Sequence, residues 1–190
     1  MRWRIPFVLT LALFVAVSCD QQPVEPELAL SPEMAVAQTE GGRGVMESAV
    51  GSGHFAPFSE DVNGFAFNAL KKADGTVKGQ VTMQVRVTGT FWKSGIDCLA
   101  VSGNVAVVSG VVSHTSTPYV GVGGWFAMED NGEGGMAEAD RITGFYGILP
   151  DFLPTPEYCH EVIQDIDAYL APFGVKWNEV IRGNVQVKGG

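Results

Sequence analysis

The stretch of sequence that decides the fold is VKGQVTMQVRVT, residues 77–88. Its apolar side chains all fall on one face of an extended chain, and polar side chains occupy most of the positions between them: the apolar set is Val77, Val81, Met83, Val85 and Val87. A period of two is typical of a strand with one face on a core and the other in water. We therefore predict a long, half-buried β-strand over residues 77–88.

The residues just before this stretch complete a hairpin. Phe65, Phe67 and Ala69 alternate with smaller or polar residues, which predicts a strand over 65–69. Ala-Asp-Gly-Thr at 73–76 supplies the turn between the two strands, because Gly75 adopts a positive φ without strain.

Further strand signals follow at short intervals, separated by turn residues. We predict strands over 97–101, 105–113, 119–128, 141–146 and 184–188. The chain has 24 glycines, and Lys, Glu and Leu are sparse in its middle part. The pattern favours a mainly β domain, either an antiparallel β-sandwich or a small barrel.

One segment has a helical period instead. Between residues 156 and 173 an apolar stripe recurs every three or four positions, formed by Tyr158, Val162, Ile163, Ile166, Tyr169, Leu170 and Phe173. Thr155 is the predicted N-cap, Pro156 suits the first turn and Gly174 suits the C-terminal stop. We predict one C-terminal α-helix at about 156–173, docked on the sheet.

The N-terminus has the features of an export signal. Arg2 and Arg4 precede an uncharged run at 5–18, and Ser18 stands directly before Cys19. The end of this run resembles the lipobox of bacterial lipoproteins, with Ala16 where leucine is usual. The resemblance implies removal of the signal peptide 1–18 and acylation of Cys19. It places the protein in the bacterial cell envelope, lipid-anchored to a membrane and facing the periplasm or the exterior. An ordinary export signal and an uncleaved anchor are the alternatives.

The residues after Cys19 predict a tether rather than a fold. Residues 19–50 are acidic, contain proline and later glycine, and keep no sustained period, so we predict a disordered linker followed by a β domain over 51–190. The formal charge of the whole chain is −9, and loss of residues 1–18 removes two arginines and no acid, which makes it −11. Such a charge disfavours nucleic acid as a partner.

Cysteine usage predicts a disulfide. If Cys19 carries lipid, only Cys98 and Cys159 remain, and an even pair in an exported protein is best read as a bridge. The alternative is a redox or nucleophilic thiol, which lacks the C-x-x-C spacing.

Acidic residues concentrate at 129–140, where glycines interrupt them. The weak candidate metal ligands are Asp130, Asn131, Glu133 and Asp140, since Ca²⁺ prefers oxygen ligands in a loop that can fold around it. The spacing does not match an EF-hand loop. A turn-rich loop, with Asp130 or Asn131 capping its own backbone, is the other interpretation. Apart from this candidate Ca²⁺, no cofactor is expected.

No catalytic set emerges from the remaining polar residues. His54, His114 and His160 lack a ligand partner two or four residues away. Aromatic residues that could line a ligand groove, or simply fill a core, are Trp92, Trp125, Trp177, Tyr119, Phe145 and Tyr146.

Several segments resemble an uncharacterised group of exported bacterial β-domains. They include Phe65-Ala-Phe-Asn-Ala69, Cys98-Leu-Ala-Val-Ser-Gly-Asn104, Glu129-Asp-Asn-Gly-Glu-Gly134 and Arg182-Gly-Asn-Val-Gln-Val187. The resemblance implies the fold and export, and it supplies no catalytic residue. We expect a non-catalytic module that binds a small-molecule ligand or an envelope protein. The alternatives are a structural or accessory subunit of an envelope assembly and a small hydrolase.

Overall fold

The computed structural model describes residues 44–58, 61–133, 137–144, 157–174 and 176–189. Nine strands lie in this part of the chain: β1 (Val45–Phe58), β2 (Asp61–Lys72), β3 (Val77–Val85), β4 (Thr90–Ile96), β5 (Cys98–Ser102), β6 (Val105–Thr115), β7 (Gly123–Glu129), β8 (Arg141–Ile142) and β9 (Asn178–Lys188). The helices are α2 (Tyr158–Val162), α3 (Ile166–Leu170) and the 3₁₀ turn η1 (Ala171–Phe173). None of the helices described is both long and apolar enough to cross a membrane.

The strands form an antiparallel meander that closes on itself. The strand order is β4-β3-β2-β1-β9-β8-β7-β6-β5, and two of the pairings join strands that are not neighbours in the sequence. The first strand, β1, pairs with the last, β9, and β4 also pairs with β6. Only Asp97 separates β4 from β5, so these two strands act as one bent strand alongside β6. The mainly β, antiparallel class predicted from the sequence is confirmed.

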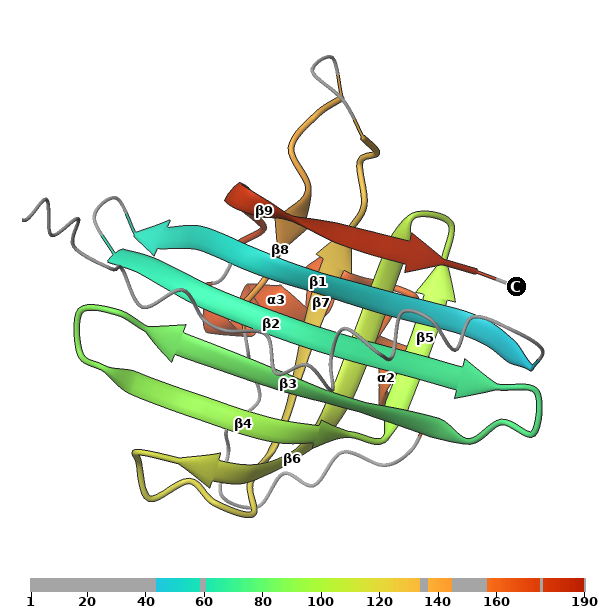
Figure 1. Ribbon diagram of the computed structural model, residues 1–190, viewed down its shortest axis with the longest axis horizontal. Coiled ribbons are helices and arrows are strands. Elements are labelled where there is room, and N and C mark those ends of the chain that lie inside the picture. The colour runs from blue at the N-terminus through green and yellow to red at the C-terminus, as the bar shows by residue number, and fades with distance from the viewer. Residues whose placement is uncertain (1–43, 59–60, 134–136, 145–156, 175, 190) are drawn as a thin grey trace, which may run out of the picture.

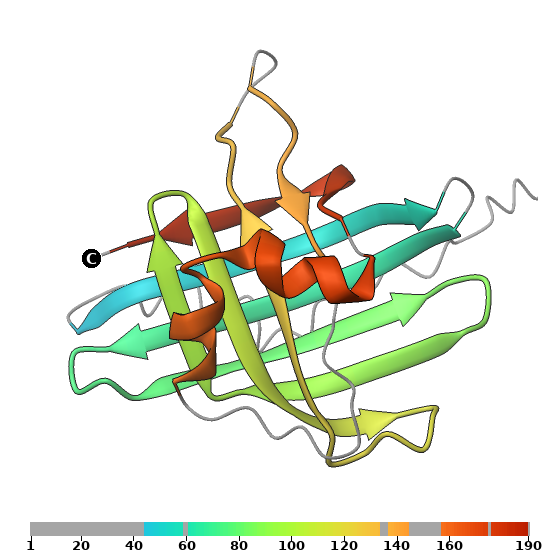
Figure 2. The same ribbon diagram turned by 180° about the vertical axis from the view of Figure 1, so that it is seen from behind.

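The closed sheet is flattened into two layers. Figure 1 shows β9, β1, β2, β3 and β4 side by side in one layer, with β5, β6 and β7 crossing behind them. Figure 2 shows the reverse side, where α2 and α3 lie over β5, β6 and β7. The order of layers is therefore sheet, sheet, helix.

The main core fills the space between the two sheet layers. Four phenylalanines form its centre, with ring centroids 6.1 Å apart for Phe55 and Phe65, 5.9 Å for Phe65 and Phe67, and 5.2 Å for Phe67 and Phe126. Apolar side chains from β3, β6, β7, β8 and β9 pack around them. An interior filled by side chains is what a small closed sheet of this strand number provides.

The hairpin predicted from residues 65–88 is confirmed, but its second strand ends earlier than predicted. β2 and β3 pair from Asn63 opposite Val85 to Lys71 opposite Val77, and Gly75 has φ +81° in the turn. β3 ends at Val85 instead of residue 88. Val87, predicted on the core face, lies in the connection to β4 and is 68% exposed. The chain must turn there to begin β4, so the strand ends although apolar and polar residues continue to alternate.

Two stretches of strand were not predicted from the sequence. β1 begins at Val45, so residues 45–50 belong to the sheet and not to the tether, which was predicted to reach residue 50. These residues are held from both sides, for example by Ala69 of β2 and Val187 of β9 opposite Ala49. β4 was not predicted at all. Its inward residues include Ser94 and its outward residues include Phe91, which inverts the expected polarity.

The predicted helix is two short helices rather than one. Val162 and Leu170 of the predicted stripe are buried, so the face is correct. The break follows from Asp165, whose side chain accepts a hydrogen bond from the Ala168 backbone N–H and starts α3 as a new helix. Gly174 ends η1 in the left-handed region at φ +64°, as expected. The predicted cap Thr155 and Pro156 lie outside the described residues.

Candidate functional site

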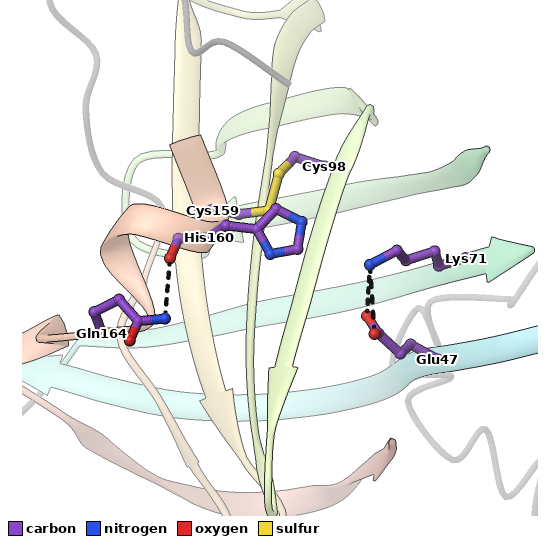
Figure 3. The surroundings of a disulfide bond; sticks show 6 residues. All are labelled: Glu47, Lys71, Cys98, Cys159, His160 and Gln164. Atoms are coloured by element: carbon purple, nitrogen blue, oxygen red, sulfur yellow. Dashed lines mark hydrogen bonds and ion pairs between the residues drawn. A yellow bond between two sulfur atoms is a disulfide. The ribbon is translucent and has the colours of Figure 1, made fainter. Parts of the chain in front are cut away.

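The helices are tied to the sheet by a disulfide. Cys98 at the start of β5 is bonded to Cys159 in α2, with Cα atoms 6.0 Å apart, as Figure 3 shows. Both residues are buried. The predicted bridge is therefore confirmed, and it occupies the two cysteines that the redox alternative would have needed as free thiols.

His160 lies next to this disulfide (Figure 3). The sulfur atoms of Cys98 and Cys159 and one ring nitrogen of His160 all lie within 4.8 Å of one another. It is the one group of three or more Cys, His, Asp or Glu side chains with metal-ligand spacing in the described ranges. A metal is held by thiolates, and here both sulfurs are in a disulfide. The group is therefore a covalent link with an exposed imidazole beside it.

A second core lies between the helices and the back layer of the sheet. Trp125 is 1% exposed and packs with Val107, Ala127, Val162 and Leu170. Its ring meets Tyr169 at 6.5 Å, and Tyr169 in turn meets Tyr158 at 5.9 Å. Burial, followed by the nearby Tyr169 and Glu161, raises the pKa of Tyr158 to about 12. Of the two interpretations of Trp125, core and ligand groove, its position supports the core.

The acidic segment 129–140 folds back against β9. All four carboxylate oxygens of Asp130 and Asp140 accept backbone N–H groups. Asp140 accepts from Asn131 at 2.9 Å and from Val185 at 2.7 Å. Asp130 accepts from Gly132 at 3.0 Å and from Val187 at 2.9 Å. The bond to Gly132 is the self-capping turn that the sequence indicated.

These carboxylates satisfy the open edge of a strand. β8 pairs with β9 only at Asn178 and Glu179, and in the part of the chain that the structure describes no other strand lies along that edge of β9. The Asp130 and Asp140 side chains supply acceptors at Val185 and Val187, where a neighbouring strand would otherwise do so. The Asp140 backbone carbonyl accepts from Val180 in the same way.

The candidate Ca²⁺ ligands come together as hydrogen-bond partners. Glu133 accepts from Asn184 and Gln186, and the Asn131 amide donates to the Ala139 carbonyl at 2.8 Å. The carboxylates of Asp130 and Asp140 are each engaged by two amide dipoles whose positive ends would oppose a cation. Within the described residues, the four candidates do not form a group with metal-ligand spacing.

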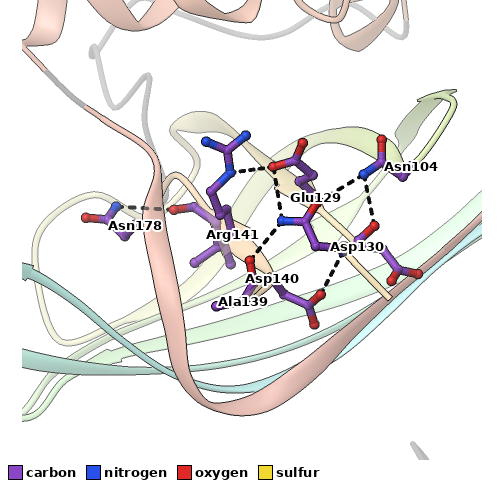
Figure 4. Close-up of polar contacts among 9 residues, drawn as sticks. Asn104, Glu129, Asp130, Ala139, Asp140, Arg141 and Asn178 are labelled. Atoms are coloured by element: carbon purple, nitrogen blue, oxygen red, sulfur yellow. Dashed lines mark hydrogen bonds and ion pairs between the residues drawn. The ribbon is translucent and has the colours of Figure 1, made fainter. Parts of the chain in front are cut away.

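Arg141, at the end of this segment, makes an ion pair and a cation–π contact. Arg141 donates to Glu129, and this hydrogen bond is the main reason that its pKa is raised (Figure 4). Its guanidinium also lies 5.3 Å from the ring centre of Trp177. Trp177, a candidate groove residue, thus covers Arg141. Tyr119 is 40% exposed in the β6–β7 connection, and Phe145 and Tyr146 lie outside the described residues.

One histidine stands beside a hydroxyl. The His114 Nδ1 lies 3.1 Å from the Ser113 Oγ, and this Oγ donates its proton to the Lys93 carbonyl at 3.1 Å. The imidazole therefore meets a lone pair of Oγ and not its proton, so the pair is not arranged as a nucleophile and its base. A His54 ring nitrogen lies 2.7 Å from an Arg86 guanidinium nitrogen.

Asn63 and Ser94, which the sequence did not single out, and Trp92, a candidate groove residue, have unusual surroundings. The Asn63 Oδ1, the Trp92 Nε1 and the Ser94 Oγ are buried and have no hydrogen-bond partner in the part of the chain that the structure describes. The polar Ser94 at a core position of β4 was the available signal. It was missed because β4 itself was not recognised. The Ser109 Oγ, beside Cys98 on the helix-covered face, is also buried and has no hydrogen-bond partner among the described residues.

No protein-family model matches the chain, and neither a curated protein nor a solved structure matches it. The predicted signal peptide 1–18 and Cys19 lie outside the described residues.

Proposed function

We propose that this protein is a lipoprotein of the bacterial cell envelope, held on a membrane by Cys19, whose β domain is a non-catalytic binding module. The mature chain would run from Cys19 through an acidic tether to β1. The tether would be shorter than the sequence indicated, because β1 begins at Val45.

The observation that supports this proposal most is the pairing of Cys98 with Cys159. Disulfides form and persist in oxidising compartments, so the bridge fits an exported protein. The chain has three cysteines, and the bridge leaves only Cys19 without a partner. A cysteine directly after an export signal, and outside the disulfide, is the expected position for a lipid.

The binding role is supported by how the polar side chains are used. Asp130, Asp140 and Glu133 serve the scaffold, and Ser113 and His114 are not arranged for proton transfer. Among the described residues, the buried polar atoms of Asn63, Trp92 and Ser94 have no hydrogen-bond partner. Polar groups that the scaffold does not use are available for recognition of a ligand or a partner.

The anchor is tested by comparing the wild-type protein with Cys19→Ser in a bacterial host. We expect the wild-type protein in the membrane fraction, with a mature N-terminal peptide whose mass includes acyl chains, because several chains hold a protein durably on a bilayer. The Cys19→Ser protein should appear in the soluble envelope fraction. Ser18→Ala, which keeps a small residue before the cysteine, is the matched control and should remain with the membrane. An unmodified wild-type N-terminus at Asp20 contradicts the anchor.

The binding role is tested by cross-linking and purification of the intact protein from envelope extract. Recovery of a ligand or of a sub-stoichiometric partner supports a binding module. Recovery only in a fixed-stoichiometry complex instead supports the accessory-subunit alternative.

A further inference from the structure

The front layer of the sheet, formed by β9, β1, β2, β3 and β4, has one face on the main core and one face outside (Figure 1). Successive side chains of a strand point to opposite faces, and directly paired residues share a face. Phe65 and Phe67 of β2 point into the core, so Gly64, Ala66 and Asn68 point outward. The strand register extends this assignment to the other four strands.

Four rows of outward residues cross the layer from β9 toward β4. They are Lys188, Ser48, Leu70 and Lys78; Gln186, Val50, Asn68, Gln80 and Gly95; Asn184, Ser52, Ala66, Thr82 and Lys93; and Arg182, His54, Gly64, Gln84 and Phe91. Neighbouring strands lie about 4.8 Å apart and alternate residues about 6.8 Å apart, so the rows cover roughly 20 by 20 Å. We call this surface the outer face.

The outer face carries positive charge although the chain as a whole is acidic. The four rows contain no aspartate or glutamate, and their exposed cations are Lys78, Lys93, Arg182 and Lys188. Arg86, directly after β3, is exposed and adds to them, because its Nη2 lies 2.7 Å from the Nε2 of His54 in the fourth row. One acid reaches the face from its side, since Glu133 accepts from Asn184 and Gln186 of β9.

Acids of the helical layer lie on the opposite side of the domain. Glu157, Glu161, Asp165 and Asp167 belong to α2, α3 and their caps, behind the second sheet layer (Figure 2). Packed sheets are about 10 Å apart, and the helices lie further away still. The Debye length at physiological ionic strength is about 8 Å. The acids of the helical layer are therefore largely screened at the outer face, where the local cations decide the sign of the potential.

Apolar side chains accompany the cations at one end of the outer face. Phe91 of the fourth row is 39% exposed, and Val87, next to Arg86, is 68% exposed. Basic and apolar side chains on one surface suit the boundary between phospholipid headgroups and acyl chains, where the cations meet phosphates and the apolar groups leave water. A soluble polyanion would use the cations alone.

We propose that the outer face docks on a bilayer surface that contains anionic phospholipids. The charge of the face is complementary to that surface, and each lysine or arginine near it strengthens binding about fivefold. This inference deepens the proposed function and rests on its anchor for proximity. A flexible chain from Cys19 to β1 would have an end-to-end distance of about 30 Å, so a weak contact would be well populated. The helical layer would then point away from the membrane.

The test uses the mature chain with Cys19→Ser, which cannot carry the lipid, in vesicle co-sedimentation at low ionic strength. Anionic vesicles contain equal parts of phosphatidylglycerol and phosphatidylcholine, and neutral vesicles contain phosphatidylcholine alone. We expect binding to the anionic vesicles that weakens as salt is added, and binding at least about tenfold weaker to the neutral ones. Equal binding to both, or no binding to either, overturns the proposal. Binding to heparin, a soluble polyanion, without binding to the anionic vesicles also overturns it.

Single lysine variants separate the outer face from net charge. Lys78→Gln and Lys93→Gln each remove a cation from the face, and Lys176→Gln, the matched control, removes an exposed cation outside the rows. Each of the first two should weaken binding to the anionic vesicles about fivefold, and the control by less than about twofold. All three lysines are exposed, so Tm should not change. Equal weakening by all three variants would show that net charge accounts for binding and would overturn the proposal.

Failure of the outer face is distinguishable from failure of the anchor. A wild-type protein acylated at Cys19, whose Cys19→Ser form does not bind anionic vesicles, would keep the anchor and lose the docking face. An unacylated wild-type protein, whose Cys19→Ser form binds these vesicles through Lys78 and Lys93, would keep the face and lose the anchor. High salt releases the docking contact, so salt-washed membranes still report the anchor alone.

Discussion

At the scale of single residues, the tightest glycine position is Gly110 of β6. A Cβ atom there would stand 1.8 Å from the carbonyl oxygen of Gly95 in β4. The two backbones are in contact where β6 passes from β5 to β4, next to a register shift between Lys93 and Ser94. Glycine is required at Gly110 by this contact. Gly95 differs, because a Cβ atom there would have no neighbour within 4 Å.

We therefore predict that Gly110→Ala lowers the free energy of unfolding by about 1–3 kcal/mol, the usual range for overpacking a close contact. Gly95→Ala is the matched control and should change it by no more than about 0.5 kcal/mol. Urea unfolding followed by fluorescence measures both. Equal stability of the two variants would contradict the close approach.

The Asp140 carboxylate is the second residue with a large expected effect. Asp140→Ala leaves the N–H groups of Asn131 and Val185 without their acceptor, and the Val185 bond is buried. We expect a loss of about 2–4 kcal/mol, from two unsatisfied donors at about 1–2 kcal/mol each. Urea unfolding measures the loss.

Glu138→Ala removes an exposed acid from the same segment and is the control. Its stability should stay within about 0.5 kcal/mol of the wild-type value. A similar loss in both variants would mean that segment charge, and not edge capping, accounts for the effect.

At the scale of elements, the helices depend on the sheet for their stability. α2 and α3 have five residues each, and helices of this length are not stable alone. Their buried residues Cys159, Val162 and Leu170 contact the back layer, and the disulfide closes a sequence separation of 61 residues. The helical layer is therefore held by one apolar surface and one covalent bond.

Replacing both cysteines in Cys98→Ala/Cys159→Ala should lower the free energy of unfolding by about 4 kcal/mol in the chain-entropy account. The helical segment should also open before the sheet does, because little else fixes it. Hydrogen–deuterium exchange should show faster exchange at residues 158–173 and little change in β2 and β3. His160→Ala is the control, since it alters the exposed neighbour and keeps the bridge. Uniform acceleration across all strands would contradict local opening.

At the scale of the whole molecule, closure of the sheet joins the two ends of the domain. β9 pairs with β1 from Ser48 opposite Lys188 to Phe55 opposite Val180. Removal of β9 would expose the edge of β1 along most of its length, and long exposed edges are templates for association.

Deletion of residues 178–190 is therefore expected to give oligomers or aggregates in size-exclusion chromatography. Deletion of residues 189–190 alone leaves β9 intact and is the control, which should elute like the full chain. A monomeric, cooperatively unfolding protein without β9 would show that closure by β1 and β9 is dispensable.

The sequence by itself determined the mainly β class, the β2–β3 hairpin, the helical face with Val162 and Leu170, and the cysteines that pair. Each of these follows from the local spacing of apolar residues, from a turn residue, or from an even number of cysteines. The tertiary structure alone decided the course of β4, the capping of β9 by Asp130 and Asp140, and the burial of Asn63, Trp92 and Ser94. These features depend on contacts between residues far apart in the chain, such as Asp140 with Val185, which no local pattern encodes.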